Sequence, residues 1–112
     1  MSKGSDRLLE IICEIYGPTT KVIKEHCIGQ RLRLDFFLPS FNLAFEYHGR
    51  QHDNYVAHYH KDAAGYRSSK RRDRMKIDRA MDQGITLIVI WHNEELTVEY
   101  VKNKILETLS KE

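Results

Sequence analysis

The apolar residues of this chain repeat with a helical period in three segments. Residues 7–16 place their leucines and isoleucines on one broad arc, and Gly17-Pro18 follows as a stop signal. Residues 68–83 form a second periodic segment that Gly84 ends, and a third runs from about Glu95 to Ser110. The sequence therefore predicts three helices. The residues expected to be buried on the second and third are Ile77, Ala80 and Met81, and Leu96, Val98, Val101, Ile105, Leu106 and Leu109.

Two further segments, 31–38 and 43–48, alternate between apolar and polar residues, which is the period of a β-strand. Turn-forming residues lie between them and indicate an antiparallel hairpin. With the centre of the hairpin at Ser40-Phe41, Asp35 lies directly across from Glu46. One face of the hairpin is expected to carry Leu32, Leu34, Phe36, Leu43, Phe45 and Tyr47. The opposite face is expected to carry Arg31, Arg33, Asp35, Ala44, Glu46 and His48.

Residues 85–91 (ITLIVIW) form an unbroken, β-branched run typical of a strand covered on both faces, so we expect it at the centre of a sheet. Residues 50–66 have no clean period and are interpreted as a loop. The order helix, strands, helix, buried strand, helix predicts an α/β fold: a mixed sheet with an antiparallel hairpin, flanked by helices. With 112 residues, the chain 1–112 fits a single domain.

Composition narrows the class of protein. Hydrophobic residues make up 41% and charged residues 30%, which predicts a packed core and excludes a disordered chain. The two cysteines, Cys13 and Cys27, have no CxxC spacing, so neither a disulfide framework nor a zinc knuckle is indicated. The N-terminus has no signal-peptide pattern, and no stretch approaches the ~20 apolar residues of a membrane span. We therefore expect a cytoplasmic protein that does not bind membranes.

The net charge of +2 hides an uneven distribution. Residues 67–79 (RSSKRRDRMKIDR) hold seven Lys or Arg against two Asp. Such a local excess can bind phosphate. A solvated helix face is the alternative interpretation.

Asp35 and Glu46 are the first candidates for chemistry. Hydrolysis of a phosphodiester near neutral pH can use a metal that holds the phosphate and lowers the pKa of a bound water. Mg²⁺ typically takes one or two carboxylates from the protein, and this pair would supply them. Two carboxylates side by side repel each other, so a cation is expected nearby. That cation could instead be Arg31 or Arg33, and the acids would then do no chemistry.

Two histidines and a third acid extend the candidate site. His48 follows Glu46 by two residues on the same face, and His52 comes shortly afterwards. An imidazole can accept a proton from attacking water or offset charge at a leaving oxygen. Asp73 is expected on the inward side of its helix, near Ala80, where a carboxylate needs a partner.

The run from His26 to His52, HCIGQRLRLDFFLPSFNLAFEYHGRQH, resembles the PD-(D/E)xK nucleases related to the very-short-patch repair (Vsr) endonucleases. In that family an Asp ends a strand, and an acidic segment leading to Gly-x-x-His follows a hairpin. The resemblance resumes at RRDRMKIDRAMDQGITLIVIW and so covers most of the chain. The most similar subgroup is the phage homing endonucleases with an EDxHD signature. The resemblance implies a restriction-endonuclease-like fold and a metal-dependent endonuclease of double-stranded DNA, inside a phage-infected or bacterial cell.

The EDxHD signature falls on Glu10, Asp35, His52 and Asp73 of this sequence. The resemblance implies that Asp35 ligates Mg²⁺ or Mn²⁺ together with Glu46 and the carbonyl of Tyr47. Glu10 would hold a water ligand of that metal.

The same resemblance implies that His52 is the general base, oriented by Asp73, while His48 stabilises the phosphate or the leaving group. Which histidine is the base remains open. The expected phosphate contacts are Arg31, Arg33, Arg50, Lys70, Arg71, Arg72 and Arg74.

The chain departs from the family pattern in three respects. His48 stands where many of these nucleases have a lysine, so the charge of that lysine must come from elsewhere. Glu14 is an alternative to Glu10 on the first helix. The cysteine-rich zinc site of Vsr proteins has no counterpart, since the available residues lack a ligand pattern: Cys27, His58 and His60.

Three other functions compete with this one. The same fold could cut DNA junctions or RNA. A non-catalytic nucleic-acid-binding module would use the basic helix alone, but two carboxylates would repel the phosphate that it binds. An interaction domain without nucleic acid leaves the clustered cations unexplained. As a nuclease, the chain would act as a homodimer or with a DNA-recognition domain in a longer chain.

Overall fold

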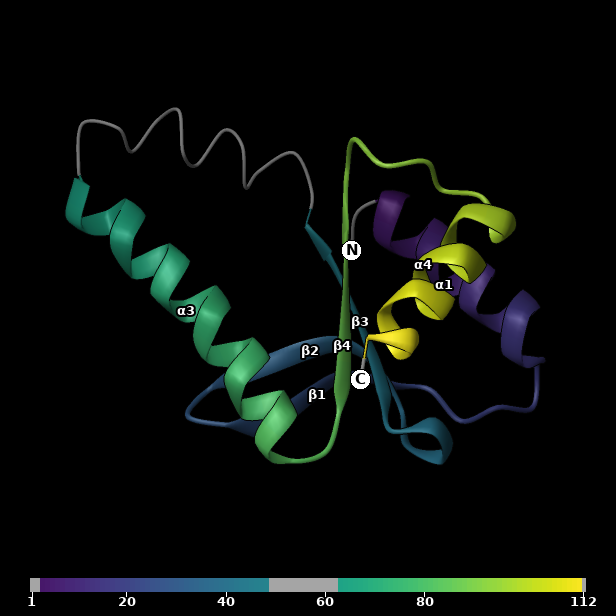
Figure 1. Ribbon diagram of the computed structural model, residues 1–112, viewed down its shortest axis with the longest axis horizontal. Helices are drawn as coiled ribbons and strands as arrows, with labels where there is room; N and C mark the ends of the chain where they lie inside the picture. Colours follow the sequence, from purple (N-terminus) through teal and green to yellow (C-terminus); the bar gives the residue numbers. More distant parts are fainter. Residues whose placement is uncertain (1–2, 49–62, 112) are drawn as a thin grey trace.

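The computed structural model describes residues 3–48 and 63–111 and has an α/β arrangement, in which helices cover both faces of a four-stranded mixed sheet (Figure 1). No helix in these two ranges is long and apolar enough to cross a membrane. The elements in chain order are α1 (Lys3–Tyr16), β1 (Ile23–Gly29), β2 (Leu32–Leu38), the 3₁₀ turn η1 (Pro39–Phe41), β3 (Leu43–His48), α3 (Ala63–Asp82), β4 (Thr86–Trp91) and α4 (Val98–Ser110).

The strands lie in the order β1-β2-β3-β4, with antiparallel pairing up to β3 and parallel pairing between β3 and β4. In the β2–β3 hairpin, Phe36 pairs with Phe45 and Leu38 with Leu43. This is the register expected from the sequence. The turn closes through η1 and Asn42, which adopts the left-handed conformation with φ 49°.

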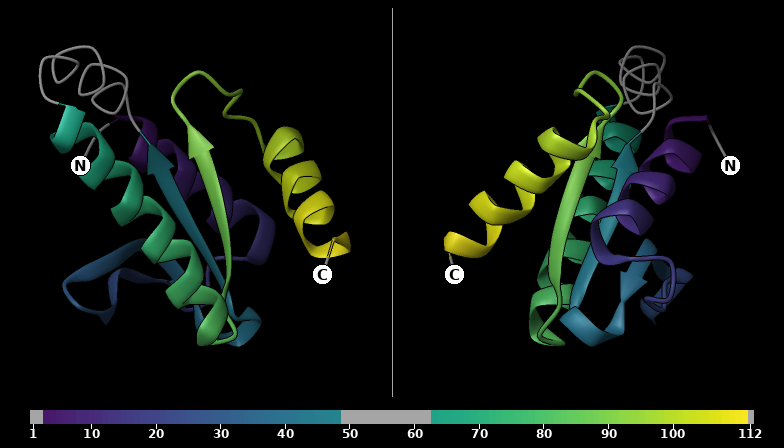
Figure 2. Two further views of the ribbon diagram at one scale, coloured as in Figure 1. Left: turned by 60° about the vertical axis from the view of Figure 1, so that its left-hand side comes forward. Right: turned by 90° about the vertical axis from the view of Figure 1, so that its right-hand side faces the viewer.

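Two separate clusters of buried side chains cover the two faces of the sheet. One face packs against α1 and α4 and the other against α3, as the right-hand view of Figure 2 shows. Glu46 and His48 alternate with Phe45 and therefore face α3. The cluster under α1 and α4 contains Leu8, Ile11, Ile12, Phe36, Leu38, Leu43, Phe45, Ile88, Ile90, Val101 and Ile105. The cluster under α3 contains Ile28, Leu32, Leu34, Phe37, Ala44, Ala80 and Ile85.

The alternation of β2 breaks at Asp35. Leu34 packs with Phe37 on the α3 side, whereas Phe36 packs on the α1 side, so the expectation that Leu34 and Phe36 share a face is wrong. In β1, the residue at the corresponding position is Glu25, which has a left-handed backbone with φ 50°. Both strands therefore change faces at one point, and Asp35 lies at that point.

The two outer strands differ from expectation. β1 was not recognised from the sequence. β4 was expected at the centre, yet among the strands described it lies at the edge. Its apolar run has another cause: Ile88 and Ile90 pack on the α1 side while Leu87 packs on the α3 side, so the edge strand is covered on both faces.

α3 begins five residues earlier than expected and ends as expected at Gly84, whose φ is 74°. Gly84 N donates to Met81 O and Ile85 N to Ala80 O, which is the hydrogen-bonding pattern of a Schellman cap. The expectation that Ile77 and Met81 are buried is wrong, since they are 43% and 68% exposed.

α4 starts at Val98, after the N-cap Thr97, whose side chain accepts a hydrogen bond from Tyr100 N. Val101 and Ile105 are buried as expected. Leu106 and Leu109 are exposed. The apolar side of α4 is therefore wider than the part of the helix that the sheet and α1 cover.

Candidate active site

The side chain of Asp35 extends from β2 toward the neighbouring strand β3, at the point where β2 changes faces. Its Oδ2 accepts a hydrogen bond of 2.8 Å from the backbone N–H of Tyr47 on β3. The contact lies just beyond the backbone pair Phe36–Phe45. The carboxylate thus occupies a place in the hairpin that a backbone carbonyl would otherwise take, and this holds it next to Glu46.

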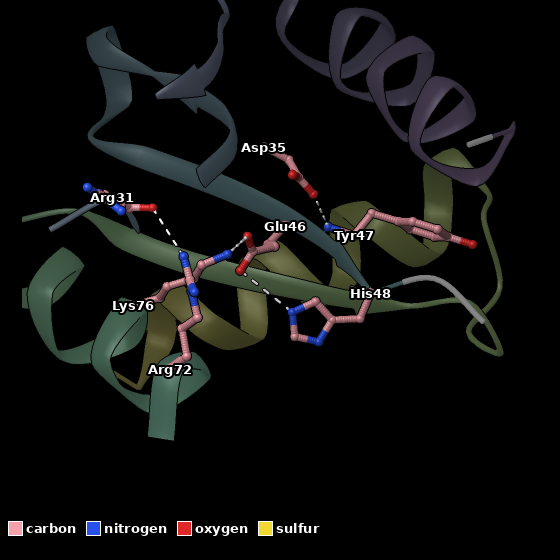
Figure 3. Close-up of polar contacts among 7 residues, drawn as sticks. All are labelled: Arg31, Asp35, Glu46, Tyr47, His48, Arg72 and Lys76. Carbon is pink, nitrogen blue, oxygen red and sulfur yellow. Dashed lines mark hydrogen bonds and ion pairs between the residues drawn. The ribbon is translucent and has the colours of Figure 1, made fainter. Parts of the chain in front are cut away.

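Glu46 points from β3 toward α3 and is only 5% exposed. Its Oε1 lies 2.7 Å from Lys76 Nζ of α3, and its Oε2 lies 3.6 Å from His48 Nε2 (Figure 3). A buried carboxylate is stable as an anion only with such partners. The site therefore joins one hairpin to one helix through an ion pair.

The two carboxylates have opposite pKa shifts. Burial alone would raise the pKa of Glu46, but the hydrogen bonds and charges of His48 and Lys76 bring it below its usual value. For Asp35, burial raises the pKa and the charge of Glu46 raises it further, while the Tyr47 N–H and the charges of Lys76 and His48 oppose this incompletely. Asp35 therefore holds its proton to a higher pH than usual, whereas Glu46 loses its proton at a lower pH than usual, as expected for coupled acids.

An open hollow adjoins this cluster. His48 is 5% exposed and its ring meets Trp91 edge-on, with the centroids 4.5 Å apart. Trp91 in turn lines a hollow of about 860 Å³ along α3. The other lining residues are Arg71, Asp73, Arg74, Met75, Ile77 and Asp78. A charged polymer bound along α3 would thus lie next to His48 and Glu46.

Of the candidates inferred from the sequence, Asp35, Glu46 and His48 come together. Lys76 joins them and was missed. A signal for it was present, because Lys76 lies between Asp73 and Ala80 on the same inward row of α3. Asp73 itself is half-buried and lines the hollow.

Glu10 does not join this group. Its side chain is 66% exposed and pairs with Arg7 at 3.1 Å, and Glu14 is likewise exposed beside Arg7. Both project from α1, whose buried residues pack on the face of the sheet opposite to α3. The expected role of Glu10, which is to hold a water ligand of the metal, therefore stays a prediction.

The remaining candidates belong to three groups. His52 and Arg50 lie outside the described residues, so the expected pairing of His52 with Asp73 is untested. Arg31 and Arg33 have exposed side chains, and the cation that neutralises Glu46 is Lys76 rather than either of them. On α3, Arg71, Arg72 and Arg74 are exposed, and Lys70 lies one turn before Arg74.

The donor set of the site fits a hard cation. Within residues 3–48 and 63–111, no three His, Cys, Asp or Glu side chains form a group that could hold a metal by themselves. Mg²⁺ does not need three, because it commonly keeps several waters and takes one or two carboxylates. Lys76 and His48 each engage one oxygen of Glu46, but an ionised carboxylate has about four acceptor sites. Asp35 and Glu46 could therefore hold such an ion together.

Comparison with known proteins gives relatives but no family. No family model matches the chain, and no solved structure matches it. It is 31% identical over 74 residues to the uncharacterized protein 307L of Invertebrate iridescent virus 6, which covers 66% of this chain and 38% of that protein. It is 25% identical over 93 residues to the uncharacterized protein 033L of Invertebrate iridescent virus 3, which covers 81% and 48%. The chain thus spans less than half the length of these curated relatives.

Proposed function

We propose that this chain is the catalytic part of a metal-dependent endonuclease that hydrolyses phosphodiester bonds in double-stranded DNA. The observation that carries the proposal is the contact between Lys76 and Glu46 beside Asp35. The resemblance to PD-(D/E)xK nucleases lacked its lysine, since His48 stands in that place. α3 supplies a lysine 2.7 Å from the second acid. This support is independent of the resemblance, which did not single out Lys76.

The roles follow from the electrostatics of the site. Asp35 and Glu46 would hold Mg²⁺ or Mn²⁺, which when bound supplies charge for the phosphate and acidifies water. A bound cation would favour the ionised form of Asp35 and so oppose the upward shift of its pKa. His48 and Lys76 together lower the pKa of Glu46, and Lys76 adds positive charge where a phosphate would lie. The N–H of Tyr47 fixes the orientation of Asp35.

The substrate class follows from the charge of α3. Two arginines and two aspartates line the hollow, so its own charges balance: Arg71, Arg74, Asp73 and Asp78. Residues 67–79 as a whole hold seven Lys or Arg against two Asp, and this excess favours a polyanion along the helix. Selection of a target sequence would lie in a homodimer or in a DNA-recognition domain of a longer chain, as the resemblance implies. A homing endonuclease, as the resemblance implies, is the specific form of this proposal.

A non-catalytic nucleic-acid-binding module is the second candidate. Glu46 is already balanced by Lys76 without a metal, and this favours a purely structural ion pair. A binding module would not need Asp35, however, whose burial beside another acid costs stability and repels phosphate. A junction-directed or RNA-directed nuclease would use the same residues and differ only in substrate.

Incubation with supercoiled plasmid tests the proposal. The wild-type protein is expected to produce nicked and linear DNA with Mg²⁺ and none with EDTA. Asp35→Asn should abolish cleavage, because the amide keeps the shape of the carboxylate and loses its charge. Glu107→Gln, an exposed acid of α4, is the matched control and should cut normally. Cleavage by Asp35→Asn at the wild-type rate would refute the role of Asp35.

A further inference from the structure

A second hollow, of about 290 Å³, lies between the β1–β2 turn and α3. Its lining residues are Gln30, Arg31, Leu32, Arg71, Arg72 and Met75. They include three arginines and no acid. We propose that this hollow binds one backbone phosphate of DNA, adjacent to the phosphate that is cut. The identity of the polymer rests on the proposed function, whereas the preference for a phosphate rests on the hollow itself.

The backbone of the turn supports a role beyond chain reversal. Gln30 and Arg31 form a two-residue turn between the paired residues Gly29 and Leu32, with φ values of 52° and 64°. Turns that need two positive φ values usually contain Asn-Gly or Gly-Gly. Other L-residues are strained in this conformation. Such strain persists where the side chain is needed, and here it places Arg31 at the hollow.

Contacts from α3 hold the hairpin tip in place. Arg72 Nη2 donates to Arg31 O at 3.4 Å, and Gln83 Nε2 donates to Ile28 O at 2.9 Å. A Cβ on Gly29 would come within 2.7 Å of Arg79 Nη1, so the helix side chain lies directly against the backbone of the turn. Because the turn is fixed to the helix, the backbone positions that carry the arginines are set before a ligand binds. Preorganisation of this kind lowers the entropy cost of binding.

Two cations on α3 lead from the hollow toward the candidate active site. Arg72 precedes Lys76 by four residues and lies on the same side of α3, and both reach toward the sheet in Figure 3. One helical turn advances about 5 Å, so the two cations form a short row along the helix. A nucleic acid strand along this row would place one phosphate at Arg31 and Arg72 and a nearby one at Lys76 and Glu46.

Fluorescence anisotropy with a short labelled DNA duplex, in EDTA, tests the hollow without cleavage. Arg31→Gly is expected to weaken binding several-fold and to lower the slope of log Kd against log salt by about one unit. The same variant should unfold at higher urea concentration, because glycine relieves the strain of the turn. A purely structural arginine would not combine weaker binding with greater stability. Lys102→Ala, which removes one exposed charge from α4, is the control and should change neither binding nor slope.

A double-mutant cycle tests whether two arginines share one phosphate. The variant that combines Arg31→Gly with Arg72→Ala should lose less DNA-binding free energy than the sum of the losses in the two single variants. Arg31→Gly combined with Arg74→Ala should be additive, since Arg74 lines the other hollow. Additive losses for the first pair would overturn the shared site.

The outcomes separate this inference from the proposed function. If the wild type cuts plasmid but Arg31→Gly binds DNA like Lys102→Ala, the proposed phosphate site is refuted and the proposed nuclease activity is supported. If Arg31→Gly loses a unit of slope but the wild type never cuts, the hollow stands and the nuclease proposal fails.

Discussion

Lys76 Nζ lies 2.7 Å from Glu46 Oε1, so a cation from α3 balances a carboxylate buried on β3. This pair explains why α3 has a sparse apolar side. Between Asp73 and Ala80, the row that faces the sheet contains Lys76 where a helix that served only the core would have a hydrophobic residue. The helix is thus positioned partly by charge, and the site and the fold depend on the same contact.

The first prediction is that the two neighbouring acids have opposite effects on stability. Glu46→Gln should lower the free energy of unfolding by about 1–3 kcal/mol, because Lys76 loses its partner in a largely buried place. Asp35→Asn should leave stability unchanged or raise it, because the amide oxygen can still accept from Tyr47 N and the costly charge is gone. Urea unfolding at neutral pH measures both. Equal losses for the two variants would contradict the opposite pKa shifts.

The second prediction concerns how these differences depend on pH. Asp35 has a folded-state pKa above its unfolded value, so its charge penalises folding above the folded pKa and the penalty disappears in acid. Glu46 has a lowered folded-state pKa, so its contribution is present above the unfolded pKa and is lost as the pH falls through the folded value. Both variants should therefore approach wild-type stability in acid. Asp35→Asn should do so from higher stability and Glu46→Gln from lower stability. Urea midpoints from neutral to acidic pH test this, and a gap that stays constant would argue against either titration.

The third prediction is that Lys76 contributes to cleavage as well as to the fold. Lys76→Met should reduce the cleavage rate by about 10²–10³, the usual effect of removing one group that stabilises a transition-state anion. DNA binding in EDTA should change much less, because Lys76 is largely engaged with Glu46. The Lys76→Met, Glu46→Gln double variant is the control for folding, since it removes both charges of the pair. If that double variant folds stably and the single variant still cuts at the wild-type rate, Lys76 is structural only.

The fourth prediction concerns the basic part of α3 expected from the sequence. Replacing Lys70, Arg71 and Arg72 together should weaken DNA binding about equally for different sequences. Each phosphate contact that is lost should flatten the salt dependence by about one unit of slope. Anisotropy titrations at several salt concentrations give the slope directly. A slope that stays at the wild-type value would mean that these side chains only solvate the helix.

The hairpin and its acids could be predicted from the sequence because both depend on local patterns. Alternation assigned Glu46 and His48 to one face, and the turn residues fixed the register that brings Asp35 and Glu46 together. The change of faces at Asp35 could not be predicted, because it depends on the pairing of β2 with the left-handed Glu25 of β1, far away in the sequence.

Two other features were missed for tertiary reasons. Lys76 belongs to a run of cations in which no local pattern distinguishes a buried ion pair from a solvated side chain. The predicted central position of β4 was wrong. An apolar run indicates that both faces of a strand are covered, and it does not indicate how many neighbouring strands lie beside it.

The last prediction separates the two histidines. The Nε2 of His48 faces Glu46 Oε2 at 3.6 Å, so this nitrogen is placed to direct an N–H toward the carboxylate rather than to take a proton from water. Loss of this N–H group should make the position of the Glu46 carboxylate less fixed. His48→Gln, which keeps an N–H donor, should therefore retain more stability and activity than His48→Leu. This assigns His48 to positioning and leaves His52 as the candidate base.

His52→Ala should then reduce the cleavage rate by about 10²–10⁴ while DNA binding in EDTA stays nearly intact. Asp73→Asn should act in the same direction and less strongly. The pH profile of cleavage distinguishes the assignments: a base that titrates near neutrality gives a rate that rises with pH through its pKa, and the variant that removes the base loses this limb. If His52→Ala keeps the rising limb and His48→Gln loses it, the roles are reversed. The contact with Glu46 would then orient the base itself, because a histidine that donates from Nε2 can accept a proton only through Nδ1.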